Sequence, residues 1–305
     1  MMQSTFAIET QHLNYAFTKH RKVINELSLQ VPAGSIFGFL GPNGAGKTTT
    51  MRMLTGIIPS EKDNIFLMGK SLQQSMPQIF TDIGTLIETP SLYLHLSGYD
   101  NLKILCTLRG MDADKINPVL KTVGLLQDGK RKVKEYSLGM KQRLGIAMAL
   151  MPNPKLLLLD EPVNGLDPVG IVEIRELLKQ LNQEHNITVF ISSHMLNEVE
   201  KTCTHVSIIH KGDLHFQGTL KEMYQTQQAE KEALFTVDNA QAAAALMQAK
   251  STPVQILNDN HIQLAFENEY EIAGINKYLV ENGISVSGID KKMGLEDWFI
   301  KITSK

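Results

Sequence analysis

The chain has 305 residues, 43% of them hydrophobic and 20% charged, which is enough to bury a full globular core and a second, smaller one. Its net charge of -2 gives no basic field of the kind that non-specific nucleic-acid binding requires, so no nucleic acid is expected as a partner. The two cysteines, Cys106 and Cys203, are far apart and outside any CxxC pattern, which argues against a disulfide framework and indicates a reducing compartment.

The N-terminal stretch "MMQSTFAIETQH" lacks a basic region followed by an apolar one, and no run of about 18 continuous apolar residues occurs anywhere. The sequence therefore predicts neither a secretory signal nor a membrane span. If the function concerns a membrane, a partner must supply the span.

The first element that carries chemistry is an apolar strand, Ser35 to Leu40, followed by a glycine-rich turn and a helix that begins near Lys47. The turn matches G-x-x-x-x-G-K-[ST], whose backbone N–H groups wrap a phosphate chain while the lysine reaches the β- and γ-phosphates and the hydroxyl ligates magnesium. A glycine turn with a chance lysine is the alternative, and the strand before it makes that a poor one. Nucleotide contacts are expected from Gly41, Pro42, Asn43, Gly44, Ala45, Gly46, Lys47, Thr48 and Thr49.

Two further strands are predicted at Lys155 to Asp160 and Asn186 to His194. Asp160 stands where a carboxylate would hold magnesium, and Glu161 is the adjacent acid that could polarise an attacking water. An acidic helix cap would explain one of these acids but not a pair at the end of a buried strand. Short apolar runs separated by helical segments indicate a parallel sheet covered by helices, with ligands at the carboxyl ends of its strands.

The stretch "YSLGMKQRLGIAMALMPNPKLLLLDEPVNGLDP", residues 136–168, resembles the signature motif, Walker B strand and D-loop of ATP-binding cassette (ABC) ATPases. Together with the glycine loop and "ISSHML", the resemblance spans about residues 5 to 220. It implies the α/β fold of P-loop NTPases with a helical subdomain, ATP and Mg²⁺ as cofactors, and ATP hydrolysis coupled to transport. It also implies a second copy of the cassette, paired head to tail so that ATP is buried between the two.

The resemblance also implies roles for individual residues. Ser137 and Gly139 would reach the γ-phosphate of the nucleotide held by the opposite subunit, and Asp167 would cross to that subunit. His194 would contact the γ-phosphate and complete a catalytic group with Lys47 and Glu161. An aromatic residue would stack on adenine, with Phe17 preferred and Tyr15 as the alternative.

The sequence departs from the common family pattern at two places. In the signature, Met140 stands where a glutamine is usual, while Ser137 and Gly139 are kept. In "IGTLIETPSLY", Glu88 stands where most members have a glutamine that touches the magnesium shell and senses the membrane subunit. Glu88 is therefore expected as a metal-side residue, and a glutamate in a loop facing water is the alternative.

The glutamate, the "YSLGMKQRLGIA" signature and the closing "GLEDWFIKIT" together are similar to the bacitracin and lantibiotic self-protection branch of these ATPases. That branch implies a cytoplasmic subunit, peripheral on the inner face of the membrane, which drives export of an antimicrobial peptide through separate permease subunits. The alternatives are the ATPase subunit of another exporter, for a drug, ion or lipid, and a soluble cassette acting on DNA or ribosomes. A small-molecule kinase would share the phosphate loop but needs no signature motif.

The last part of the chain, from about residue 221, has a different composition, and the linker-like stretch at residues 224–232 marks the boundary. Residues 221–305 read as strand, helix, strand, strand, helix, strand, which is the ferredoxin-like, split βαβ pattern of an α+β domain. No cluster of residues in this part indicates chemistry, so a packing or dimer-stabilising role is expected. The predicted organisation is a nucleotide-binding domain at 1–220 and this small domain at 221–305.

Overall fold

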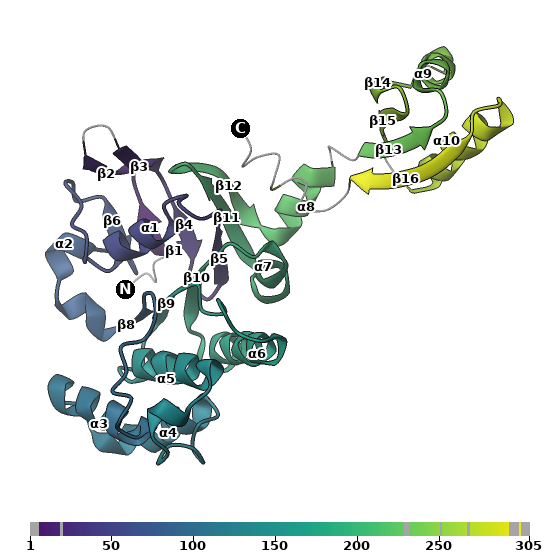
Figure 1. Cartoon of the computed structure of the whole chain (residues 1–305). Coiled ribbons are helices and arrows are strands. Elements are labelled where there is room, and N and C mark those ends of the chain that lie inside the picture. Colours follow the sequence, from purple (N-terminus) through teal and green to yellow (C-terminus); the bar gives the residue numbers. More distant parts are fainter. Residues whose placement is uncertain are drawn as a thin grey trace. The chain divides into compact units, whose positions relative to one another are not determined.

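The computed structural model describes residues 6–18, 21–228, 232–250, 252–266, 269–292 and 299. Its contacts divide the chain into two compact units, Met1–Leu220 and Lys221–Lys305 (Figure 1). Apart from Phe299, the closing stretch at 294–303 lies outside the described residues, as do residues 229–231. The predicted linker at 224–232 is wrong in its first part, because residues 224–228 belong to a helix, Leu220–Gln228.

The centre of the first unit is a six-stranded sheet with the strand order β12-β11-β5-β10-β9-β8. All neighbouring pairs are parallel except β11 with β12, which is antiparallel at one edge. The strands predicted from short apolar runs are present, with ends that differ by at most two residues, so the parallel sheet is confirmed. The strands are β5 (Ile36–Leu40), β8 (Ile83–Leu86), β9 (Leu156–Asp160), β10 (Thr188–Ser193), β11 (His205–His210) and β12 (Asp213–Thr219).

Helices cover both faces of this sheet because its strands are apolar on both sides. Phe37 and Phe39 share a buried core with Met51 of α1, whereas a Cβ on Gly38 would lie only 2.7 Å from Val199 of α7. Since successive side chains of a strand point to opposite faces, α1 and α7 lie on opposite sides of the sheet. The bounds are α1 (Lys47–Leu54), α6 (Pro168–His185), which also packs on β5 and β10, and α7 (Leu196–Thr202).

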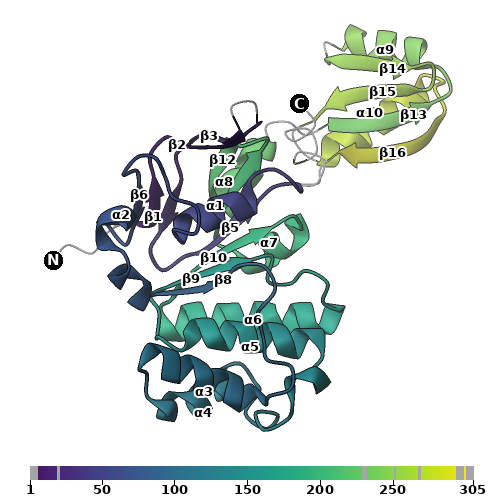
Figure 2. The ribbon, with the colours of Figure 1, turned by 60° about the vertical axis from the view of Figure 1, so that its left-hand side comes forward.

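Between β8 and β9 the chain forms a helical subdomain whose helices pack on one another (Figure 2). It joins the sheet closely, because a Cβ on Gly84 of β8 would lie 2.2 Å from the carbonyl oxygen of Ala149. The helices are α3 (Gly98–Arg109), α4 (Ile116–Thr122) and α5 (Leu138–Leu150), with short 3-10 turns at Ala113–Lys115 and Val133–Glu135. A further 3-10 turn at Gln78–Thr81 precedes β8.

The N-terminal part adds antiparallel strands that the sequence did not predict. One sheet has the order β4-β1-β6-β7, and β2 pairs with β3 as a hairpin. Its buried side chains, including Ile8, Leu27 and Leu67, belong to the same core as α1, so this part fixes the phosphate-loop helix from outside the central sheet. The elements are β1 (Phe6–Thr10), β2 (Leu13–Thr18), β3 (Arg21–Leu27), β4 (Gln30–Pro32), β6 (Ile65–Leu67), β7 (Lys70–Ser71) and α2 (Leu72–Ser75).

The second unit has its own core, built around Phe235, Ile262 and Leu264. Its antiparallel sheet has the order β14-β15-β13-β16, so β15 lies between the two strands that flank α9, which is the predicted split βαβ arrangement. Across the described residues of both units, no helix is long and apolar enough to cross a membrane. The remaining elements are α8 (Leu220–Gln228), β13 (Glu232–Val237), α9 (Ala240–Ala249), β14 (Val254–Asn258), β15 (His261–Ala265), α10 (Glu269–Glu281) and β16 (Val286–Lys292).

Candidate functional site

The glycine loop connects β5 to α1 at the carboxyl edge of the sheet. Gly41 has no room for a side chain, since a Cβ there would lie 2.4 Å from the carbonyl oxygen of Ile209. Gly46, at the helix N-terminus, has φ of 111°, a conformation that L side chains rarely adopt. The Lys47 ammonium folds back over the loop and donates to the carbonyl oxygens of Gly41 at 2.8 Å and Pro42 at 3.3 Å. Backbone N–H groups, a helix N-terminus and a buried cation thus meet at one place, which is the composition of a phosphate site.

One cleft, here called the nucleotide cleft, opens over this loop. Its walls include Glu161, His194 and Phe17 beside the loop itself, so the structure brings together the predicted phosphate-binding, catalytic and adenine-stacking residues from four separate parts of the chain. The full lining is Phe17, Lys22, Val23, Asn43, Gly44, Gly46, Lys47, Thr48, Thr49, Glu161, Asn164, His194 and Lys211.

Glu161 is held between two side chains across this cleft. Its Oε1 lies 3.2 Å from the Lys47 Nζ, and its Oε2 lies 2.9 Å from the His194 Nδ1. Its backbone is in the left-handed region, with φ of 48°, which costs a non-glycine residue about 1–3 kcal/mol and persists only where the surroundings impose it. The strain and the two partners hold one carboxylate over the phosphate loop.

Asp160 is fixed by a residue that sequence reasoning missed. Ser192, on the neighbouring strand, lies opposite Asp160 in the parallel register. Its hydroxyl donates to the Asp160 Oδ1 and accepts from the backbone N–H of Glu161 at 2.9 Å, so one side chain orients both acids. The signal was the first serine of "ISSH", one position before the strand end, but the register that places it could not be read from the sequence.

The two aromatic candidates lie in different clefts. Phe17 is 51% exposed and lines the nucleotide cleft, whereas Tyr15 lines a separate pocket with Ile57 and Ile58. Their rings meet edge to face, with centroids 5.1 Å apart, so Tyr15 supports Phe17 from behind.

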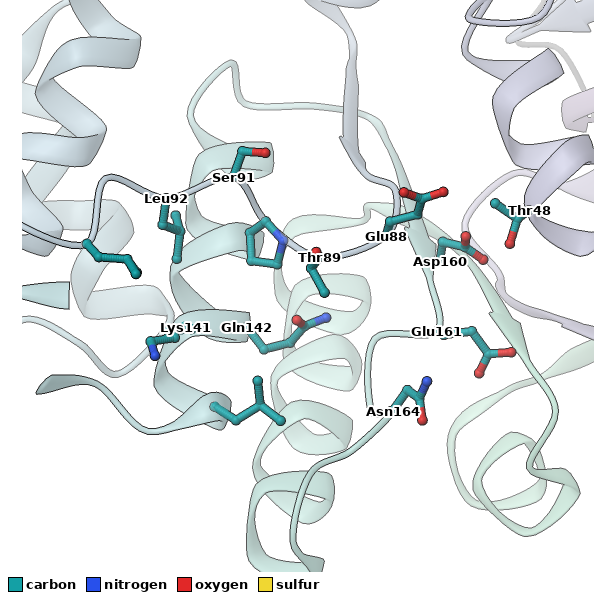
Figure 3. A pocket seen from close by; sticks show the side chains of 13 residues that line it. Thr48, Glu88, Thr89, Ser91, Leu92, Lys141, Gln142, Asp160, Glu161 and Asn164 are labelled. Atoms are coloured by element: carbon teal, nitrogen blue, oxygen red, sulfur yellow. The ribbon is translucent and has the colours of Figure 1, made fainter. Parts of the chain in front are cut away.

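A second cleft, here called the loop cleft, adjoins the first and shares Thr48, Glu161 and Asn164 with it. Figure 3 shows the Thr48 hydroxyl, the Asp160 carboxylate and the Glu88 side chain near one another in this cleft. Sequence reasoning missed the partner of Glu88: its Oε1 is paired with the Arg52 guanidinium of α1. It also missed Gln142 and Asn164, two amides that line this cleft.

Ser137 and Gly139 are not brought into either cleft. Ser137 is the N-cap of α5, and its hydroxyl accepts from the backbone N–H of Met140 at 3.2 Å. Asp167 is the N-cap of α6 and accepts from the backbone N–H of Gly170 at 2.8 Å. Ser137 and Asp167 thus each have a capping task within their own chain.

Magnesium fits this site only in combination with a phosphate ligand. Among the described residues, no group of three or more His, Cys, Asp or Glu side chains could hold a metal ion by itself. Thr48 and Asp160 instead offer a hydroxyl and a carboxylate in one cleft beside the phosphate loop. This is the donor set that Mg²⁺ uses when nucleotide phosphates and water complete its six ligands.

The fold and the site together define a P-loop nucleotide-binding protein with a helical subdomain. A family model described as "ABC transporter" matches residues 24–164. A solved structure described as cbiO1 from Clostridium perfringens, part of the ABC transporter complex cbiONQ, superposes with a TM-score of 0.67 and is 26% identical, covering 74% of this chain and 93% of that chain.

The curated relatives extend this similarity over the full length. The bacitracin transport ATP-binding protein BcrA of Enterococcus faecalis is 37% identical over 305 residues, which is 99% of this chain and 98% of the relative. The BcrA of Bacillus licheniformis is 40% identical and covers 92% of both proteins. The lantibiotic transport ATP-binding protein SrtF of Streptococcus pyogenes is 41% identical over 226 residues, which is 72% of this chain and 96% of the relative. The chain therefore belongs to the ATP-binding subunits of ABC transporters, an ATPase family, as its motifs predicted.

Proposed function

We propose that this chain binds and hydrolyses ATP to drive export of an antimicrobial peptide of the bacitracin or lantibiotic kind. The peptide passes through separate permease subunits, and the chain binds to these subunits at the inner face of the membrane. The observation that carries the hydrolytic part is the Glu161 carboxylate held between Lys47 and His194 in the nucleotide cleft. The peptide part is supported by relatives named for bacitracin and lantibiotic transport at 37–41% identity.

In this proposal, the phosphate loop binds the triphosphate through its N–H groups, and Lys47 pairs with the β- and γ-phosphates instead of Glu161. Release from Lys47 leaves the Glu161 carboxylate free to accept a proton from an attacking water, with His194 fixing its orientation. Thr48 and Asp160 would hold magnesium, which would supply positive charge to neutralise the charge that develops on the phosphates. Phe17 stacks on the adenine ring.

The proposal includes a second copy of the chain. α5 begins at Ser137 with the positive end of its dipole, and it does so outside the chain's own nucleotide cleft. A head-to-tail pair would present this N-terminus, through Ser137 and Gly139, to the γ-phosphate in the opposite subunit, with Asp167 at the same interface.

The first prediction separates binding from hydrolysis. Glu161→Gln removes the charge but keeps the shape, so ATP should stay bound, two copies should be trapped together, and turnover should fall about 10²–10⁴-fold, the usual contribution of a general base. Lys47→Ala should instead weaken ATP binding itself. ATP binding, ATPase rate and gel filtration with ATP and Mg²⁺ measure the three effects.

Glu176→Gln is the matched control, because that glutamate lies on α6 with its carboxylate in an exposed ion pair with Lys179. A Glu161→Gln variant that stays monomeric with undiminished ATPase would remove Glu161 from its role. The peptide part is tested in cells that carry the chain and its permease: bacitracin or lantibiotic resistance should be lost with Glu161→Gln. Isolation of the membrane partner with this chain as bait would then identify the transporter.

A further inference from the structure

Arg52 lies on the phosphate-loop helix α1, beside the expected magnesium-binding residue Thr48. It stands four residues after Thr48 on α1, so the two side chains are on the same face of the helix, one turn apart. The Arg52 guanidinium is paired with the Glu88 Oε1, and Glu88 shares the loop cleft with Thr48 and Asp160. Glu88 is therefore paired with a cation of α1 and lies in one cleft with Thr48 and Asp160, and Figure 3 shows these last three side chains near one another.

Three carboxylates meet around this position, and each already has a partner. Glu161 is paired with Lys47, and Asp160 accepts from the Ser192 hydroxyl. Glu88 is paired with Arg52. A glutamine at position 88 would bring no charge and would need no cation, so Arg52 offsets the negative charge that this chain's glutamate adds beside the metal position.

The pair does little for stability. The Arg52 side chain is 36% exposed and the Glu88 side chain 56%, and ion pairs as exposed as this contribute about 0–1 kcal/mol. Glu88 also has φ of 64°, a strained conformation for a non-glycine residue. Because the pair contributes little to stability and includes a strained residue, we infer that it positions the Glu88 carboxylate rather than stabilising the fold.

The loop after Glu88 is held firmly at its other end. Pro90 packs against Gly145 of α5, where a Cβ on the glycine would lie 2.9 Å from the Pro90 Cβ. Arg52, Glu88 and Pro90 thus connect the phosphate-loop helix to the helix that begins with the signature motif. The position of the Glu88 carboxylate therefore depends on whether it pairs with the Arg52 guanidinium or binds a metal held by Thr48 and Asp160.

We propose that Arg52 is a positioning residue that holds the Glu88 carboxylate on α1 and so limits its access to the metal at Thr48 and Asp160. This inference rests on the proposed nucleotide and magnesium site. Pairing with the guanidinium offsets part of the Glu88 charge and fixes the carboxylate on α1, so the carboxylate is a weaker metal ligand while it is paired. Loss of Arg52 therefore releases Glu88 toward the metal, and the effect requires Glu88 to be a carboxylate.

The test is the affinity for Mn²⁺, used as a paramagnetic substitute for Mg²⁺, in the full chain saturated with a non-hydrolysable ATP analogue. Arg52→Ala should bind Mn²⁺ about three- to tenfold more tightly than wild type, the size of effect expected when the Glu88 carboxylate charge is freed to approach the metal in a partly solvated cleft. In the Glu88→Gln background, Arg52→Ala should change the affinity by less than about twofold, because no carboxylate is released there. Arg52→Lys, which keeps the charge but not the planar fork, should fall between wild type and Arg52→Ala.

Arg109→Ala is the matched control, since Arg109 is an exposed arginine in the last turn of α3. An equal effect of Arg52→Ala in the wild-type and Glu88→Gln backgrounds would show that Arg52 acts as an independent charge and would overturn the proposal. Unchanged Mn²⁺ affinity, with only a lower melting temperature, would show a packing role and would overturn it too. Asp160→Asn tests the underlying metal site. If this variant binds Mn²⁺ with the same affinity as wild type in the presence of the analogue, the proposed metal site is wrong, and the proposed function fails independently of Arg52.

Discussion

Glu88 and Glu161 share an unusual backbone conformation, with φ of 64° and 48°. Both follow a strand of the central sheet and both line the loop cleft. A left-handed backbone costs a glutamate more conformational free energy than it costs a glycine, yet both positions hold glutamate. The strain turns both carboxylates toward the phosphate-loop helix, where each meets a cation of α1: Lys47 for Glu161 and Arg52 for Glu88.

A prediction at the residue scale concerns adenine. Because Phe17 lines the nucleotide cleft and Tyr15 does not, Phe17→Ala should weaken ATP binding about tenfold, which is within the range for loss of one base-aromatic stack. Phe17→Trp should restore binding. Tyr15 packs on the core that contains α1, so Tyr15→Ala should mainly lower the free energy of unfolding, by about 1–3 kcal/mol. Calorimetric ATP titration and urea unfolding of both variants measure this, and a larger ATP effect from Tyr15→Ala would reverse the assignment.

At the scale of elements, the sequence predicted what local pattern controls. The strands that end at Leu40, Asp160 and Ser193 were recognisable because they are short, apolar and followed by polar residues with a known chemistry. The antiparallel strands before and after α1 were not predicted, and three of them, β4, β6 and β7, have only three, three and two residues. Local patterning is too short there to set a period.

The parts of the site that sequence reasoning missed depend on distant pairings. Arg52 and Glu88 are 36 residues apart, and Ser192 is 32 residues from Asp160. Parallel register and helix rotation bring these pairs together, and neither can be read from one sequence without a fold. The motif residues needed no such information, because the glycine loop places Gly41 to Thr49 by chain continuity alone.

The prediction for elements concerns the start of α5. Ser137 caps this helix, so Ser137→Ala should cost about 1 kcal/mol of stability, which would confuse a test of its proposed contact with the opposite subunit. Aspartate is an equally good cap and also suits the positive end of the helix dipole. Ser137→Asp should therefore keep the melting temperature and ATP binding of wild type. It should abolish turnover, because its charge would repel the γ-phosphate across the pair.

Asp167→Asn is the corresponding change at the N-terminus of α6, because asparagine removes the charge of Asp167 but keeps the helix cap. Thermal unfolding, nucleotide binding and ATPase rate are measured side by side on these variants. Undiminished turnover in a well-folded Ser137→Asp protein would place Ser137 away from the phosphate.

At the scale of the whole molecule, the chain consists of two units with separate hydrophobic cores. Each residue of the nucleotide cleft and the loop cleft belongs to the first unit. The SrtF relative aligns over 226 residues that make up 96% of its own length, close to the length of this first unit, and it is named for lantibiotic transport. The cleft residues therefore all lie in the first unit, and each unit has its own hydrophobic core. A relative about as long as the first unit is itself named as a transport ATP-binding protein.

The last prediction follows from this separation. A chain that stops after Gln228 keeps α8 intact, including its fully buried Met223, and omits the second core entirely. It should fold, unfold in a single transition and bind ATP within about threefold of the full chain, because each core buries its own apolar surface and every cleft residue is retained. Far-ultraviolet circular dichroism, thermal unfolding and ATP titration test this, with Lys47→Ala in the shortened chain as the control for specific binding. If the shortened chain aggregates or fails to bind ATP, the first unit depends on the second for its stability, and the two cores are not energetically independent. Gel filtration of the shortened Glu161→Gln variant with ATP adds the decisive comparison: if it pairs as well as the full-length variant, the small unit is not what stabilises the dimer.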